Sequence, residues 1–119
     1  MNEKKANPEL QHLIEKLRHT SAKEGVGVWK SIAATLAGST RKRPVVNISR
    51  INRYAQENEI VVIPGKVLAA GDLDKAVQVA AYQYSADARA KIEQSKGKAF
   101  TLLELIEKNP KGKDVRILG

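Results

Sequence analysis

The chain has 119 residues, 42% of them hydrophobic, which predicts one domain, residues 1–119, around a single core. Lys and Arg number 21 against 13 Asp and Glu, and the formal net charge of +8 attracts polyanions. The absence of cysteine excludes disulfides, thiolate zinc sites and cysteine nucleophiles. The sequence starts with no secretory leader and has no membrane-spanning apolar run, so we expect a soluble, intracellular protein with no membrane partner.

The first elements in the chain are predicted to be helices. Asn7 offers a cap, Pro8 a first-turn proline, and the apolar residues that follow recur at helical spacing, so we expect a helix from Pro8 to about Thr20. A second helix is predicted to start near Val28, with Gly38 as its left-handed C-terminal cap. Residues 1–38 are therefore expected to form a helical hairpin.

Beyond residue 38 the pattern alternates between short strands and short helices. We predict strands at 44–48, 60–63, 76–81 and 115–118, with Pro64-Gly65 ending the second of them and 67–68 too short to assign. Ser49 is predicted to cap a helix through Tyr54, and Ser85 one that ends near Gly97. Thr101 and Glu104 have capping-box spacing, and their helix stops before residues 109–110. This interleaving over residues 44–119 favours a layered α/β core over an all-helical bundle.

The net charge is concentrated in one short stretch. Residues 41–53 hold five cations and no acid: Arg41, Lys42, Arg43, Arg50 and Arg53. We expect residues 41–43 to be extended because a proline follows, and the last two arginines to share a helix face. Arginine can grip phosphate through two hydrogen bonds, and Ser49 with its helix N-terminus could add N–H donors. The alternative is a solvated charged loop, although such surfaces usually mix both signs.

A second set of cations is predicted to make further contacts with a polyanion. Lys66 follows Pro64-Gly65, and the C-terminal lysines stand beside glycines in segments expected to be mobile loops: Lys96, Lys98, Lys111 and Lys113. For Lys96 and Lys108, favourable interaction with the helix dipole is an equally good explanation.

The scarcity of aromatic residues bears on the type of nucleic acid. Single-strand readers stack bases on exposed aromatic rings. Trp29 falls in an apolar helical stripe and is expected in the core, which leaves Tyr54 as the best candidate for stacking. We therefore predict recognition of folded RNA by its shape and phosphate positions.

No catalytic constellation emerges from the sequence. His12 and His19 are expected to be exposed on the first helix, without a carboxylate partner or a third metal ligand. Residues 64–66 lack the spacing of a phosphate loop, and Asp72 and Asp74 are explained as turn and helix-capping acids. We predict that the chain is not an enzyme and uses no cofactor, metal or small-molecule substrate; a small hydrolase built on these acids and histidines is a minor alternative.

The order and spacing of several segments resemble a known family. These segments are LRHTS at 17–21, VWKSIA at 28–33, VNISRINRY at 46–54, VIPGKVL at 62–68, GDL at 71–73, VAA at 79–81, SADARAKIE at 85–93 and NPKGKDVRIL at 109–118. Together they are similar to the archaeal and eukaryotic large-subunit ribosomal protein family eighteen-e, a relative of bacterial large-subunit protein fifteen. The chain departs from the family's glycine-rich loops at residues 69–71 and 95–97, which puts local loop contacts there in doubt.

The resemblance implies a function without catalysis. It implies an α/β structural protein bound to large-subunit rRNA beside neighbouring ribosomal proteins, in the cytoplasmic ribosome, and the length is similar to that of the archaeal form. The alternative is a basic adaptor outside the ribosome that binds DNA or acidic protein surfaces.

Overall fold

A computed structural model describes residues 7–119 of the chain. The first six residues, to which the expected absence of a secretory leader refers, lie outside the described part. In chain order the helices and strands are α1 Pro8–Glu24, α2 Gly27–Ala37, the 3₁₀ turn η1 Thr40–Lys42, β1 Val45–Asn47, α3 Ile48–Tyr54, β2 Ile60–Leu68, β3 Gln78–Tyr84, α4 Ala86–Gln94, β4 Lys98–Thr101, α5 Leu102–Lys108 and β5 Val115–Ile117.

The predicted N-terminal hairpin is confirmed, with changes at both helix ends. Asn7 Oδ1 accepts hydrogen bonds from the N–H groups of Glu9 and Leu10 and starts α1 as expected. The helix continues past Thr20 to Glu24, because the left-handed residue that ends it is Gly25, at φ 67°. Gly38 was predicted to take that role for α2, which is wrong: it has extended backbone at φ −80° and ψ −167°.

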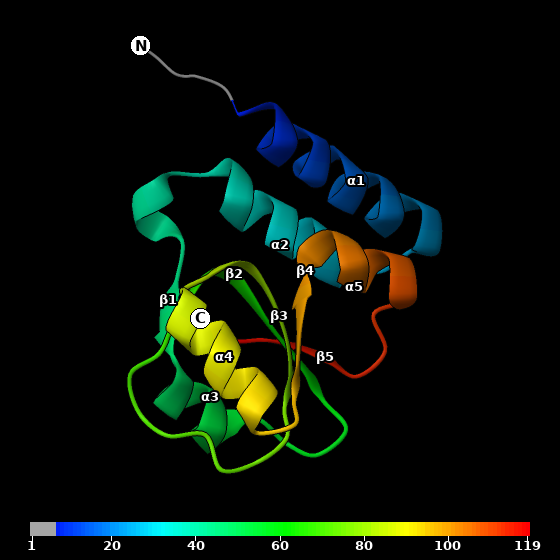
Figure 1. Cartoon of the computed structure of the whole chain (residues 1–119). Helices are drawn as coiled ribbons and strands as arrows, with labels where there is room; N and C mark the ends of the chain where they lie inside the picture. The colour runs from blue at the N-terminus through cyan, green and yellow to red at the C-terminus, as the bar shows by residue number, and fades with distance from the viewer. Residues whose placement is uncertain (1–6) are drawn as a thin grey trace.

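The five strands of residues 7–119 all run parallel, with β2 at the centre of the sheet. The order is β1-β2-β3-β4, and β5 pairs with the first half of β2 while β1 pairs with its second half (Figure 1). The prediction that Pro64-Gly65 ends this strand is wrong. Ile63 pairs with Ala81 and Lys66 with Gln83, so the Pro-Gly pair forms a bulge opposite one residue of β3. Proline has no N–H to donate to a neighbouring strand, and the bulge accommodates this gap in the hydrogen bonding. The strand therefore continues through residues 67–68.

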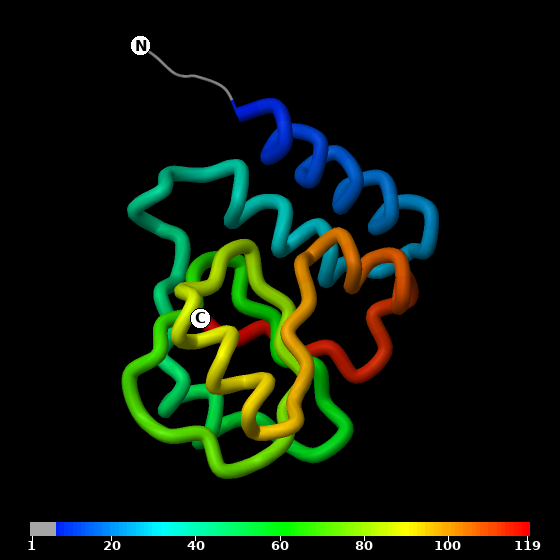
Figure 2. The backbone as a smooth tube through the Cα atoms, in the orientation of Figure 1, coloured from blue at the N-terminus to red at the C-terminus, as the bar shows by residue number. Residues whose placement is uncertain are grey.

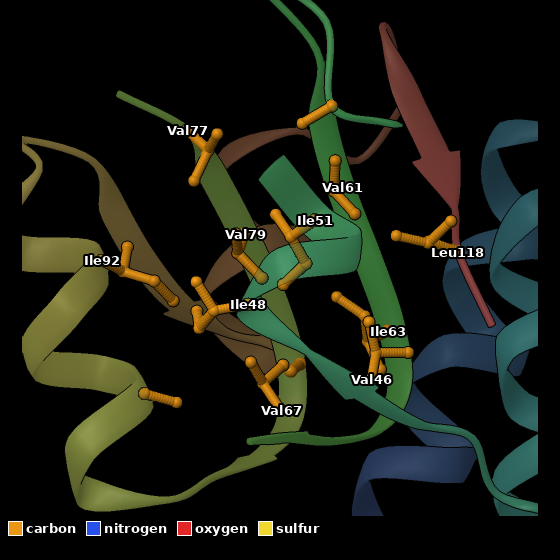
Figure 3. Packing of buried hydrophobic residues seen from close by; sticks show 13 residues of the cluster. Val46, Ile48, Ile51, Val61, Ile63, Val67, Val77, Val79, Ile92 and Leu118 are labelled. Carbon is orange, nitrogen blue, oxygen red and sulfur yellow. The ribbon is translucent and has the colours of Figure 1, made fainter. Parts of the chain in front are cut away.

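The sheet is covered by helices on both faces, which confirms the layered α/β class. Along β2, Val61 and Ile63 pack toward α3 and α4, while Val62 packs toward α1, α2 and α5. Figure 3 shows the first of these cores, in which Ile48 and Ile51 of α3 face the sheet. A parallel sheet buried on both faces accounts for the continuous apolar runs in its strands.

The second half of the chain contains one strand that the sequence did not reveal. Ser85 Oγ accepts from Ala88 N–H and starts α4, as predicted. Between α4 and α5, residues 98–101 form β4 and pair with residues 78–81 of β3, although Lys98 was expected in a mobile loop. This segment is a strand because it pairs with the free edge of β3. Its four residues, beginning with a lysine, have little preference for a strand by themselves.

The long connection between β2 and β3 is anchored on α3 and α4. Figure 2 shows it passing around the end of the molecule beside these two helices. Asp74 donates its N–H to Asn52 Oδ1 at 3.1 Å, and Ser95 donates to the Leu73 carbonyl at 2.8 Å. Asp72 and Asp74 lie in irregular backbone of this connection, between bends at residues 71 and 75, and β3 follows them, so the predicted helix-capping role is wrong.

Candidate nucleic-acid interface

The first part of the basic stretch is a compact turn and not the extended segment that was predicted. Ser39 Oγ accepts the N–H of Arg41 at 3.2 Å, and the Ser39 carbonyl accepts the N–H of Lys42 at 3.0 Å, which closes η1. Only Arg43, directly before the proline, has the expected extended backbone, at φ −71° and ψ 131°. The side chains of Arg41 and Lys42 are exposed at the surface of this turn.

Arg43 differs from the other cations of the stretch because its side chain is half-buried. One terminal nitrogen, Nη2, donates to the carbonyl of Leu36 at 3.0 Å, and the guanidinium carbon lies 5.4 Å from the centre of the Tyr82 ring. Its Nε is buried without a hydrogen-bond partner among residues 7–119. This arginine therefore ties the end of α2 to β3, and less of its guanidinium is left for a ligand.

Arg50 and Arg53 share one face of α3, as their spacing predicted. Together with Ser49 and Tyr54 they line a hollow of about 300 Å³ that has no acidic residue in its wall. Arg50 also donates to the Gly119 carbonyl at 3.2 Å, and its guanidinium carbon lies 5.9 Å from the centre of the Tyr54 ring. The Tyr54 side chain is 42% exposed, so it remains accessible for stacking.

Ser49 lies in this hollow but does not cap α3, contrary to the prediction. The helix begins at Ile48, and Asn47, two residues before Ser49, occupies the cap position without a side-chain hydrogen bond. The N–H of Ser49 donates instead to the carbonyl of Ala70 at 3.1 Å. Its backbone donor is therefore used inside the protein and is withdrawn from any ligand.

The connection after β2 holds α3 in position. Lys91 of α4 donates through Nζ to the carbonyls of Ala69 and Gly71, both at 2.7 Å. Gly71 has φ 97°, and a Cβ there would overlap the Cβ of Ser49, so the connection can approach α3 this closely only with glycine.

The remaining predicted cations do not gather in one place. Lys66 lines a hollow at the carboxyl ends of β3 and β4. Lys98 and Lys113 meet in another hollow, together with Lys108, but Asp114 shares its wall. Lys96 and Lys111 are exposed outside both hollows. The structure therefore does not unite the C-terminal lysines into one patch.

Two arginines that the sequence analysis missed line hollows whose described walls contain cations and no acidic residue. Arg18 of α1 lines a hollow that it shares with Arg43. Arg89 of α4 lines the hollow that contains Lys66. Both follow acidic residues closely in the chain, so a search for acid-free runs passes over them. The sequence indicates only that both arginines lie on helices. It does not indicate that the fold brings them to the same end of the sheet.

The remaining groups of interest for catalysis are two histidines and a tyrosine hydroxyl. His12 and His19 are exposed on α1, and within residues 7–119 no three His, Asp or Glu side chains gather where they could hold a metal ion. Burial raises the pKa of the Tyr84 hydroxyl above its usual value of 10.0, an effect that Arg89 partly offsets. This hydroxyl lies 2.7 Å from the Phe100 carbonyl and joins β3 to β4. No helix in the described part is long and apolar enough to cross a membrane.

Comparison with known proteins gives a consistent match along the whole chain. The family model described as "Ribosomal protein 60S L18 and 50S L18e" matches residues 1–119. The chain is 47% identical over 114 residues to the large ribosomal subunit protein eL18 of Methanothermobacter thermautotrophicus, covering 96% of this chain and 94% of that protein. It is 44% identical over 115 residues to the protein of the same name from Archaeoglobus fulgidus, covering 97% and 98%. The match to the protein of that name from Methanococcus maripaludis is 46% over 113 residues, covering 95% and 94%.

Proposed function

Since the chain belongs to the ribosomal protein 60S L18 and 50S L18e family and is a large-subunit ribosomal protein, we propose that it binds large-subunit rRNA through contacts to phosphates. The relatives carry the names of ribosomal proteins and not of enzymes, in agreement with the prediction that the chain is a structural protein. In this proposal its partners are rRNA and neighbouring ribosomal proteins, and its location is the cytoplasmic ribosome.

The observation that carries the proposal is the acid-free basic stretch at residues 41–53. Arg41 and Lys42 extend from η1, and Arg50 and Arg53 extend from α3, so four of its five cations are exposed. Exposed cations without neighbouring carboxylates neutralise phosphates and release the counterions condensed on them. Arginine adds paired hydrogen bonds to two phosphate oxygens, which fixes the orientation of the protein on the RNA.

The scaffold under these cations supports binding to RNA that is already folded. Arg50 and Arg53 stand on a helix whose buried residues, Ile48 and Ile51, are fully enclosed by the sheet and α4. The hydrogen bonds from the connection after β2 hold the same helix from the other side. Cations at fixed spacing match a fixed array of phosphates better than cations on a mobile loop, because little side-chain and backbone entropy is lost on binding.

The salt dependence of binding tests this proposal. Replacement of the four exposed cations by glutamine should make the slope of log affinity against log salt shallower by about 3, since each phosphate contact contributes roughly 0.7 to 0.9. Affinity of the purified protein for large-subunit rRNA, measured by filter binding over a range of salt concentrations, gives this slope. The half-buried Arg43 is left unchanged because its contacts to Leu36 and Tyr82 support the fold.

A matched control separates a binding site from a general effect of net charge. Four exposed lysines on the opposite layer of the protein can be replaced by glutamine with the same loss of charge: Lys16, Lys23, Lys30 and Lys108. The proposal expects this control to keep most of the wild-type slope. Equal losses in both variants would show that residues 41–53 are not the contact. A chain that sediments apart from large subunits in high-salt sucrose gradients would instead favour the non-ribosomal adaptor.

A further inference from the structure

A second basic surface lies at the carboxyl ends of β3 and β4, away from α3. The helix that follows β3 packs on the same face of the sheet as α3, whereas the helix that follows β4 packs on the opposite face. Where the helices that follow two neighbouring strands pack on opposite faces of the sheet, a crevice opens between the strands at their carboxyl ends. Open α/β sheets bind their ligands in such crevices. Here the crevice holds a hollow of about 370 Å³, lined by Lys66, Arg89, Tyr82 and Gln83 among others.

A second hollow adjoins the first through Tyr82. It has a volume of about 540 Å³ and lies between the start of α1, the end of α2 and η1. Arg18 and Arg43 supply its charge, and Gln11 and Thr40 supply neutral polar groups. Both volumes fall within the range of sites that receive small ligands. We call the two hollows together the Tyr82 cleft, because they share this residue.

The lining of the Tyr82 cleft has the composition of a nucleotide-binding surface. The charged residues in its described walls are all cations, Arg18, Arg43, Lys66 and Arg89. Arg89 also forms an exposed ion pair along α4, with its Nε 3.6 Å from Glu93 Oε2. Two other hollows in the described part mix signs, with Asp114 or Glu57 beside lysines. Cations alternating with aromatic rings and amides suit a strand whose phosphates are neutralised while its bases stack or accept hydrogen bonds.

Tyr82 is held at the centre of this cleft by two features of the scaffold. The guanidinium of Arg43 lies over its ring, 5.4 Å from the centre. The bulge at Pro64-Gly65 of β2 stands directly opposite it in β3. Bulges are frequent beside binding sites, where they change the direction of a side chain. Tyr82 as a residue is half-buried, so it is partly accessible at the place where the two hollows meet.

From this arrangement we infer that the Tyr82 cleft receives an unpaired stretch of rRNA, with a base against Tyr82 and phosphates on Arg18, Lys66 and Arg89. The inference rests on the proposed function and adds a second contact of a different kind to it. A recessed cleft admits a single strand, whose bases are free to enter, whereas a duplex keeps its bases paired inside the helix. The basic stretch on η1 and α3 contacts phosphates of folded RNA, and the cleft holds a segment that leaves the fold.

Fluorescence anisotropy with two RNA probes tests the inference. The protein for this comparison carries glutamine at Arg41, Lys42, Arg50 and Arg53, which removes the proposed contact with folded RNA. We expect this variant to bind a labelled single-stranded oligouridylate more tightly than an A·U duplex of equal length. Tyr82→Leu should weaken oligouridylate binding by about tenfold without changing its salt slope, because stacking on a ring releases no counterions. Tyr82→Phe should retain the wild-type affinity. The matched control is Ile117→Ala, which removes an exposed apolar side chain on β5 outside all the hollows described above and should leave oligouridylate binding unchanged.

A measurement on the wild-type protein covers the case in which Tyr82→Leu fails to fold. Oligouridylate should protect the amine of Lys66 from acetylation while leaving Lys16 of α1 reactive. An unprotected Lys66, a preference of the four-glutamine variant for the duplex, or an unchanged affinity in a folded Tyr82→Leu protein would each overturn the inference. Loss of all binding to large-subunit rRNA by the wild type would instead overturn the proposed function, so the two failures are distinguishable.

Discussion

Gly71 is predicted to be the glycine on which the position of α3 depends. Its φ of 97° lies outside the conformations that residues with a side chain adopt readily, and an added Cβ would overlap the Cβ of Ser49. A left-handed conformation costs about 1–2 kcal/mol for a residue with a Cβ. Relief of the overlap by a shift of α3 or of the connection costs about 1–3 kcal/mol more. Gly71→Ala should therefore lower the free energy of unfolding by about 3 kcal/mol.

Two other glycines allow these contributions to be separated. Gly25 also has positive φ, at 67°, but a Cβ there would meet nothing within 4 Å, so Gly25→Ala should cost only about 1 kcal/mol. Gly27 opens α2 with neither constraint, and Gly27→Ala should be neutral or stabilise the protein by about 0.5 kcal/mol. Urea denaturation followed by the fluorescence of the buried Trp29 measures all three variants. A cost for Gly71→Ala no greater than that for Gly25→Ala would refute the steric argument.

The remaining predictions concern the cap of α5 and the half-buried Tyr84. Thr101→Ala should lower the free energy of unfolding by about 1 kcal/mol, because it removes the acceptor for the Glu104 N–H at 3.1 Å, whereas Thr101→Ser should retain the cap. The raised folded-state pKa of Tyr84 means that its contribution to stability is present below pH about 10 and is lost as the pH rises further. Urea denaturation at increasing alkaline pH should therefore show a steeper decline for the wild type than for Tyr84→Phe, by up to about 1.4 kcal/mol per pH unit.

Features that depend on neighbouring residues in the chain could be predicted from the sequence. Asn7, Ser85 and Thr101 each cap the helix that was assigned to them, because a cap needs only a side-chain oxygen and N–H groups two or three residues away. The indole of Trp29 is fully buried as expected, and it donates to the carbonyl of Pro110 at 2.7 Å. The spacing of apolar residues in the helix predicted that this tryptophan is buried. The same spacing carries no information about its hydrogen-bond partner, which lies 81 residues away.

Features that depend on a distant partner could not be predicted. Serine is a residue type that often caps helices, yet the N–H of Ser49 donates to the carbonyl of Ala70. Ala70 can approach it because Lys91 and Gly71 allow the connection to lie there. Residues 98–101 become a strand through pairing with β3, and Pro64-Gly65 is accommodated by a bulge in the same pairing. In each case a tertiary contact decides the conformation against the local preference.

The cations show why a charge count and a binding surface are different properties. The number of basic residues sets the long-range field, and in that respect Arg43 is equivalent to Arg41. The scaffold then separates them: one guanidinium is exposed on η1, while the other donates to Leu36 and lies over Tyr82. The reverse holds for Arg18 and Arg89, which stand beside acids in the sequence and yet reach acid-free hollows. Because parallel strands bring their carboxyl ends together, the fold assembles from scattered cations a surface that no run of the sequence contains.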